Sequence, residues 1–279
     1  MFFILIFMLG LAIGSFLNVL IDRLPQEESI IGRSHCDHCK KDLAWNDLMP
    51  ILSYVYLGAR CRYCGKKLSF VYPLVEIITA ALFVFVVSLP SLNLRGSPAS
   101  LLNLGGSSAV EGALLSIHVF VLEKLALLGI VSMAIVIFFS DLKYQIIPDS
   151  IQLSLFAFSF LFLITKGVTP QVFLAQVVAA FAVMLPILII FLVTRGKGMG
   201  FGDVKFAFSL GFLLGIVDGV LALYTGFITG ALVGIGLIFL RKKGLKSKIA
   251  FGPFLVLGLL TMLFFKNNIV QLLKHFYRF

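Results

Sequence analysis

Two aspartates stand at the ends of apolar segments, and they are the strongest chemical signal in the sequence. Asp203 follows Gly200-Phe201-Gly202 and begins an apolar stretch, and Asp141 ends the apolar run 135–140. A carboxylate at membrane depth is costly and usually functional. Two carboxylates at close range share one proton, so that one serves as base and the other as acid, as peptide hydrolysis requires. Spacing alone does not show that Asp141 and Asp203 meet.

Glycines surround one of these aspartates. Gly196, Gly198, Gly200 and Gly202 alternate with other residues just before Asp203. Glycine lets another backbone approach closely, which suits an extended substrate lying beside an acid. A phosphate-binding loop would need a preceding strand or a Gly-Lys-Ser/Thr ending, and the sequence has neither here. Gly200 and Gly202 are therefore candidate substrate-binding residues, while the alternative role for Asp203 is a helix cap.

All four cysteines of the chain fall in two close pairs, Cys36-x2-Cys39 and Cys61-x2-Cys64, separated by 21 residues. Two such pairs on opposing turns can present four thiolates to Zn²⁺ in a tetrahedron. Two disulfides or four reduced thiols are the alternatives. A shell of Cys36, Cys39, Cys61 and Cys64 has no open position, so we expect a structural zinc, with His35 and His38 outside the ligand set.

The elements that must position these residues are membrane helices. The chain of 279 residues is 60% hydrophobic and only 13% charged, too apolar for a soluble domain. A span needs about 20 apolar residues. We predict an all-α polytopic membrane protein with about eight transmembrane helices, at about 2–21, 71–89, 118–140, 149–165, 171–194, 204–217, 219–240 and 250–266.

Charge predicts the orientation of these spans. No basic residue precedes the first span and no small-x-small site follows it, so we expect a retained helix with its N-terminus outside rather than a signal peptide. Alternation then places most of the 23 lysines and arginines in inside loops, as the positive-inside rule requires; the basic C-terminal tail is the exception. Because these residues are divided among short loops, no nucleic-acid partner is expected.

The predicted topology gives three units. Residues 1–21 form the first transmembrane helix, 22–70 a cytoplasmic zinc-binding domain with the four cysteines, and 71–279 the transmembrane part with both aspartates. Residues 90–117 are expected to form a flexible outer connector. Two further acids, Asp149 and Asp218, are expected to cap the helices that follow them.

Many strings of the chain resemble the bacterial type IV prepilin peptidases, also called leader peptidase/N-methyltransferases. The resemblance covers nearly the whole length. It rests on Gly14-Ser15-Phe16-Leu17-Asn18-Val19-Leu20-Ile21-Asp22-Arg23-Leu24-Pro25, the paired cysteines, Tyr72-Pro73-Leu74-Val75-Glu76, Asp141-Leu142-Lys143-Tyr144-Gln145-Ile146-Ile147-Pro148-Asp149, and Gly198-Met199-Gly200-Phe201-Gly202-Asp203-Val204-Lys205.

The resemblance implies an inner-membrane aspartic protease of the Gly-x-Gly-Asp type with Asp141 and Asp203 as its catalytic pair. It implies that prepilins and type II secretion pseudopilins are cleaved on the cytoplasmic side, after a glycine that ends a basic leader. Many members then N-methylate the new terminal residue with S-adenosylmethionine. Glu76 is a candidate for binding a substrate amine or leader, with a polar residue facing other helices as the alternative, and Lys205 is a further candidate substrate-binding residue.

Three other classes compete with this interpretation. A proton- or ion-coupled transporter would use Asp141 and Asp203 as proton carriers, but such folds usually show broken helices and inverted halves, which we do not find in the sequence. A non-enzymatic assembly protein would use the cysteine loop for docking. An intramembrane protease of the signal-peptide-peptidase kind would share the Gly-x-Gly-Asp motif without the four cysteines.

Overall fold

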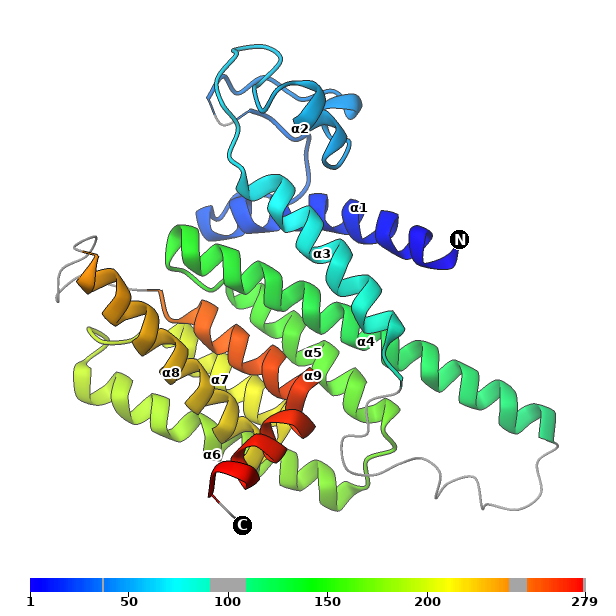
Figure 1. The fold of residues 1–279 in the computed structure, drawn as a ribbon, viewed down its shortest axis with the longest axis vertical. Helices are drawn as coiled ribbons and strands as arrows, with labels where there is room; N and C mark the ends of the chain where they lie inside the picture. The colour runs from blue at the N-terminus through cyan, green and yellow to red at the C-terminus, as the bar shows by residue number, and fades with distance from the viewer. Residues whose placement is uncertain (37, 91–108, 241–249, 278–279) are drawn as a thin grey trace.

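The computed structural model describes residues 1–36, 38–90, 109–240 and 250–277, and within these ranges the fold is helical with no extended strand (Figure 1). The long helices are α1 (Phe2–Arg23), α3 (Val71–Ser88), α4 (Ala109–Tyr144), α5 (Asp149–Thr165), α6 (Pro170–Thr194), α7 (Phe201–Leu214), α8 (Ile216–Phe239) and α9 (Gly252–Tyr277). Short helices η1 (Leu24–Gln26), η2 (Trp45–Asp47) and α2 (Leu52–Tyr56) lie between α1 and α3. The predicted all-α class is confirmed.

Each of the eight predicted spans coincides with one of these long helices. Six of the helices are long and apolar enough to cross a membrane: α1, α3, α4, α6, α8 and α9. The 17-residue α5 and the 14-residue α7 are shorter. Fourteen residues of α-helix measure about 21 Å, less than a hydrocarbon core of about 30 Å, so α7 depends on its neighbours for its place in the bundle.

The prediction that residues 90–117 form a connector is wrong for residues 109–117. α4 begins at Ala109, so residues 109–117 continue the following helix instead of forming a loop. Good helix formers such as alanine, leucine and glutamate dominate this stretch, and their propensity extends the helix beyond the apolar run. Residues 91–108, like the basic segment 241–249, lie outside the described residues.

Helix α4 lies at the centre of the bundle, against α1, α3, α5 and α9 (Figure 1). Of the six candidate spans it is the most enclosed, with 72% of its apolar window buried. Fully buried side chains along it include Leu127, Ile130 and Ile137. A helix that is apolar on all faces must be surrounded by others, and this position fixes the direction in which its last turn, with Asp141, meets the neighbouring helices.

Helices α1 and α3 pack closely because α1 carries glycines at four-residue spacing. A Cβ atom at Gly10 would lie 2.5 Å from the Ala80 Cα atom, and one at Gly14 would lie 2.7 Å from the Glu76 Cα atom. Small residues four apart are the usual device for close contact between membrane helices. The segment that joins the two helices, residues 24–70, projects from one end of the bundle (Figure 1).

Candidate active site

Asp141 lies in the last turns of α4, where the beginning of α9 crosses it. Its Oδ2 atom accepts a hydrogen bond from the Gly252 N–H at 2.8 Å. A Cβ atom at position 252 would lie 2.7 Å from the same oxygen, so only glycine lets the α9 backbone approach the carboxylate this closely. Gly252 was not among the residues predicted for the site. The signal that could have found it is the Gly252-Pro253 pair at the start of the last span.

Asp203 lies in the first turn of α7 and closes that turn. Its Oδ2 atom accepts a hydrogen bond from the Gly200 N–H at 3.1 Å, and Gly200 is the N-cap residue of the helix. A carboxylate at this position satisfies a free N–H group and complements the helix dipole. The cap role considered for Asp203 is therefore present in the structure, and the same contact fixes its carboxylate in space.

The fold brings Asp141 and Asp203 together, which spacing in the sequence did not show. Both side chains are buried, at 6% and 7% exposure, and they are near enough for the charge of Asp141 to act on Asp203. In the described part of the chain neither carboxylate has a lysine, arginine or histidine within ion-pair distance. Two adjacent buried carboxylates without a counter-ion are most stable when they share a proton.

The glycine segment before Asp203 is held by side chains of α5 and of the turn before it. Gln152 Nε2 donates a hydrogen bond to the Gly202 carbonyl oxygen at 2.8 Å. A Cβ atom at Gly202 would lie 3.2 Å from the Ile147 Cβ atom, so this turn packs tightly against α7. The Gly200 and Gly202 backbone thus lies beside the aspartate pair, as the interpretation of these glycines requires.

Two predictions about charged residues near this site need correction. Asp149 does not cap α5, because the N-cap residue is Pro148 and makes no side-chain capping bond. Asp149 instead forms an ion pair with Lys205, a predicted substrate-binding residue. The Lys205 Nζ and Asp149 Oδ1 atoms are 2.7 Å apart. Asp218, also expected to cap, lies in the first turn of α8 and pairs with Lys266. Each of these acids thus pairs with a lysine of another helix. The residues at a helix end do not indicate such a distant partner.

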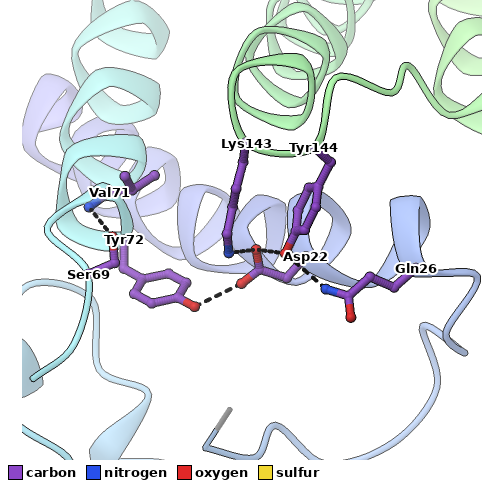
Figure 2. Close-up of polar contacts among 7 residues, drawn as sticks. All are labelled: Asp22, Gln26, Ser69, Val71, Tyr72, Lys143 and Tyr144. Carbon is purple, nitrogen blue, oxygen red and sulfur yellow. Dashed lines mark hydrogen bonds and ion pairs between the residues drawn. The ribbon is translucent and has the colours of Figure 1, made fainter. Parts of the chain in front are cut away.

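A second polar cluster joins α1 and α3 to the end of α4, beyond Asp141 (Figure 2). Asp22 accepts hydrogen bonds from Lys143 Nζ at 2.6 Å, from Tyr72 Oη at 2.8 Å and from Tyr144 Oη at 3.3 Å. Gln26 Nε2 donates to Tyr144 Oη at 2.9 Å. From the sequence, Asp22 was expected to belong to a mixed, solvated surface that could attract a basic leader. Its partners Tyr72 and Lys143 are 50 or more residues away along the chain.

Glu76, the other carboxylate predicted to bind substrate, is buried in α3 away from the aspartate pair. Its exposure is 7%, and its Oε2 atom accepts a hydrogen bond from the Ile51 N–H at 2.8 Å. Ile51 belongs to the segment that projects from the bundle. Glu76 therefore connects α3 to the four-cysteine segment and is separate from the Asp141–Asp203 pair.

The four cysteines converge as predicted. The sulfur atoms of Cys36, Cys39, Cys61 and Cys64 all lie within 4.8 Å of one another, and none is in a disulfide. Zn–S bonds of about 2.3 Å place tetrahedral sulfurs about 3.8 Å apart, and the Cys36 and Cys64 sulfurs are 3.9 Å apart. His35 and His38, expected to lie outside the ligand set, do not belong to the cluster. The donor set fits a closed structural zinc site.

The two cysteine pairs are held by matching turns. Cys36 and Cys61 each donate an N–H to the carbonyl of a residue five positions on, Lys41 and Lys66. The N–H of Cys64 lowers the pKa of the Cys61 thiol to about 7. The N–H of Lys66 acts to lower the pKa of the Cys64 thiol. Burial from water and the neighbouring cysteine sulfurs act in the opposite direction and together raise that pKa to about 11. Cysteine binds a metal ion as the thiolate, so zinc binding here would release protons.

Family models match both parts of the chain. The bacterial peptidase A24 N-terminal domain matches residues 8–89, which include the four cysteines, Asp22 and Glu76. The type IV leader peptidase family matches residues 128–235, which include Asp141 and Asp203. The two matched regions meet in the structure through the contacts of α1 and α3 with α4.

Curated relatives cover nearly the whole chain. The chain is 30% identical over 285 residues to a prepilin leader peptidase/N-methyltransferase of Aeromonas hydrophila, covering 92% of this chain and 89% of the relative. It is 26% identical over 269 residues to the Bacillus subtilis protein of the same name, covering 96% of each. No solved structure matches the chain. The chain belongs to the type IV leader peptidase family.

Proposed function

We propose that this protein is a membrane aspartic endopeptidase that removes the basic leader from type IV prepilins or type II secretion pseudopilins and then N-methylates the new terminus. The observation that carries the peptidase is the meeting of Asp141 and Asp203, both buried and without a cation in the described residues. Relatives named prepilin leader peptidase/N-methyltransferase support both activities. No finding supports the transporter alternative.

In this proposal Asp141 and Asp203 share one proton. The ionised carboxylate takes a proton from a water molecule as that water attacks the scissile carbonyl carbon, and the protonated one donates to the carbonyl oxygen and later to the leaving amine. The N–H groups of Gly252 and Gly200 keep one oxygen of each carboxylate in place. A fixed pair needs little reorganisation during the reaction.

The backbone around Asp203 supports a position for the substrate. Gly200 and Gly202 have no side chains between the aspartate and an extended peptide lying beside it. Lys205, one helical turn later, is 38% exposed at its side chain and already pairs with Asp149. We propose that Lys205 orients a substrate carbonyl or carboxylate next to the cleavage site and that Asp149 holds the lysine in position.

The cysteine cluster is proposed to hold a structural Zn²⁺. Cys36, Cys39, Cys61 and Cys64 would occupy all four positions and leave none for water, so the ion stabilises the loop without joining the reaction. One bound zinc per chain is expected in metal analysis of the purified protein. Cys36→Ser should lower zinc content and thermal stability, whereas normal cleavage per folded molecule should remain.

The proposed functional units are the first helix (1–21), the cysteine domain (22–70) and the peptidase part (71–279). We further propose an inner-membrane location with the N-terminus outside and with the cysteines and both aspartates facing the cytoplasm. Lys143, two residues after Asp141, pairs with Asp22, and Lys205, two residues after Asp203, pairs with Asp149. Both ion pairs thus lie next to an aspartate of the proposed pair, which supports one shared side. Accessibility of a single cysteine introduced at position 2 would test the outside N-terminus.

The test of the proposed activity is cleavage of a purified pilin-like precursor whose basic leader ends in Gly-Phe, with product masses measured. The wild-type protein should cut after the glycine, and with S-adenosylmethionine present the product should gain the mass of one methylene group. Asp141→Asn and Asp203→Asn should lower cleavage at least about 1,000-fold, because each removes one half of the acid–base pair. Glu27→Gln, at an exposed position outside both sites, is the control. Cleavage retained in either aspartate variant would overturn the pair.

A further inference from the structure

The segment between α1 and α3 carries large apolar side chains that its own small core leaves uncovered. Leu52, Val55 and Tyr56 of α2, and Trp45 of the adjoining η2, are all between 60% and 83% exposed. No residue of α2 or η2 is buried. Apolar side chains gathered in this way mark a surface that binds another molecule or a membrane. We call these four residues the α2 face.

The exposed residues of α2 lie on one side of the helix. Leu52, Val55 and Tyr56 occupy positions i, i+3 and i+4, which are neighbours on a helix surface. Ser53 and Tyr54, between them, are half-buried and line the cavity that separates this segment from α1 and α3. One side of α2 therefore faces the rest of the protein, and the apolar side faces outward.

A hydrogen bond fixes the position of α2 along the neighbouring spans. The N–H of Ile51, the N-cap residue of α2, donates to Glu76 Oε2 at 2.8 Å. Glu76 lies five residues after Val71, the first residue of α3, which is about 8 Å along that helix. Figure 1 shows α2 over the middle of α1 and not beyond either of its ends. α2 thus lies back alongside two helices that are long and apolar enough to cross a membrane.

Lipid is the occupant that this position supplies. The outer surfaces of membrane-spanning helices are covered by lipid, so a segment that lies back alongside two of them meets the headgroup region. Tryptophan and tyrosine are enriched at that level, because each ring has an apolar body and a polar group. Trp45 and Tyr56 have this character. Phe70, the N-cap residue of α3, is also 65% exposed where the segment rejoins the span.

The charge of the same part of the segment favours anionic lipid. Residues 45–70 contain four basic residues and one acid, namely Arg60, Arg62, Lys66, Lys67 and Asp47. Arg62 pairs with Asp47, and the other three basic residues are exposed. One basic side chain near an anionic leaflet strengthens binding about fivefold. An apolar face accompanied by basic residues is typical of segments that lie on anionic membranes.

We propose that the α2 face docks on the bilayer, where its side chains enter the lipid–water interface and the three basic residues bind anionic headgroups. The inference goes beyond the proposed peptidase and requires only that the chain lies in a membrane. The four-cysteine segment is then held by α1, by α3 and by lipid. Asp22 of α1 pairs with Lys143, two residues after Asp141 (Figure 2), so docking would also steady the end of α4 that carries Asp141.

The chain itself provides the probe, because Trp45 is its single tryptophan. The unaltered full-length protein is placed, one copy each, in nanodiscs of phosphatidylcholine and phosphatidylglycerol. Trp45 fluorescence is then quenched either by iodide in the water or by lipids brominated near the headgroup end of the acyl chain. We expect quenching by the brominated lipids and protection from iodide. Full quenching by iodide, with none by the brominated lipids, would overturn the inference.

A matched pair of substitutions tests the apolar side of α2. Val55 and Ile31 are both β-branched and highly exposed, but Ile31 lies outside α2 and η2. Val55→Asp should abolish quenching of Trp45 by brominated lipid, whereas Ile31→Asp should leave it unchanged. Unchanged quenching in Val55→Asp, or equal loss in both variants, would contradict docking through the α2 face. The measurement on the unaltered protein decides the question if a variant fails to fold.

Lipid composition tests the basic residues. Lys66→Gln should lower the ratio of protected to iodide-accessible Trp45 about fivefold in discs that contain phosphatidylglycerol, and should have no effect in phosphatidylcholine alone. A ratio that does not depend on phosphatidylglycerol would overturn the choice of anionic lipid. Protection of Trp45 that appears only when a pilin precursor or a second copy is added would show that a protein covers the α2 face, and would also overturn the inference.

Discussion

The two ends of the helix bundle bury carboxylates to the same degree but compensate them differently. At one end Glu123 and Asp218 are 4% and 8% exposed, and each pairs with a lysine, Lys166 or Lys266. At the other end Asp141 and Asp203 are 6% and 7% exposed, and each accepts a hydrogen bond from a backbone N–H group, of Gly252 and Gly200 respectively.

The two arrangements distinguish buried acids that stabilise the fold from buried acids that remain available for chemistry. A lysine partner fixes a carboxylate in its ionised form, and removing one member of the pair leaves an uncompensated charge. A backbone N–H orients a carboxylate without fixing its protonation. Acid–base work requires the second arrangement, because the group must gain and lose a proton.

The largest effect on stability is expected from breaking a pair at the first end. Lys166→Met removes the cation 2.8 Å from Glu123, where both side chains are less than a tenth exposed. Loss of one partner of a buried pair costs about 3–5 kcal/mol, measured by denaturant unfolding in micelles. The double variant Glu123→Leu/Lys166→Met should recover most of that loss. A single variant as stable as wild type would contradict the structural role.

A smaller effect, confined to activity, is expected from crowding the second end. Gly252→Ala places a methyl group where the Asp141 carboxylate now lies, 2.7 Å from Oδ2. Displacing a reacting group by about 1 Å costs about 100-fold in rate, so kcat for precursor cleavage should fall to that extent. Gly236→Ala, whose Cβ would meet nothing within 4 Å, is the matched control. Equal activity in the two variants would show that Asp141 tolerates displacement.

The smallest effect is expected at the exposed rim of the site. Asp149 is 74% exposed at its side chain, and exposed ion pairs contribute about 0–1 kcal/mol. Lys205→Met should therefore change the free energy of unfolding by less than about 1 kcal/mol. KM for the precursor should rise with kcat nearly unchanged, because the lysine is proposed to orient substrate. A fall in kcat alone would place Lys205 in the chemistry instead.

Sequence alone predicted the helices and the cysteine cluster because both depend on local pattern. Apolar runs of about 20 residues and two Cys-x2-Cys pairs carry their own structural meaning. It also named Asp141 and Asp203 as a pair, but their meeting depends on how α4, α7 and α9 pack. Gly252 could not be predicted for the same reason, because its hydrogen bond to Asp141 joins residues 111 positions apart in the sequence.

Charged partners were the least predictable feature. Asp149 and Asp218 looked like helix caps because each begins a helix, yet lysines 56 and 48 residues away compete successfully for them. For the buried Asp218, an ion pair in a site of low dielectric is stronger than a bond to a free N–H at a helix end. Asp149 is largely exposed, so low dielectric does not explain its pair with Lys205. Nothing in the local sequence reports where a distant lysine will lie.

The most direct test of the comparison uses two aspartates at opposite ends of the bundle, Asp203 in the first turn of α7 and Asp218 in the first turn of α8. Asp203→Asn and Asp218→Asn change the same atoms at nearly equal burial, and cleavage per folded molecule and Tm are measured for both. We predict that Asp203→Asn loses cleavage with Tm maintained, and that Asp218→Asn keeps cleavage with a lower Tm. Cleavage by Asp203→Asn, or loss of cleavage in a fully stable Asp218→Asn, would contradict the division between catalytic and structural acids.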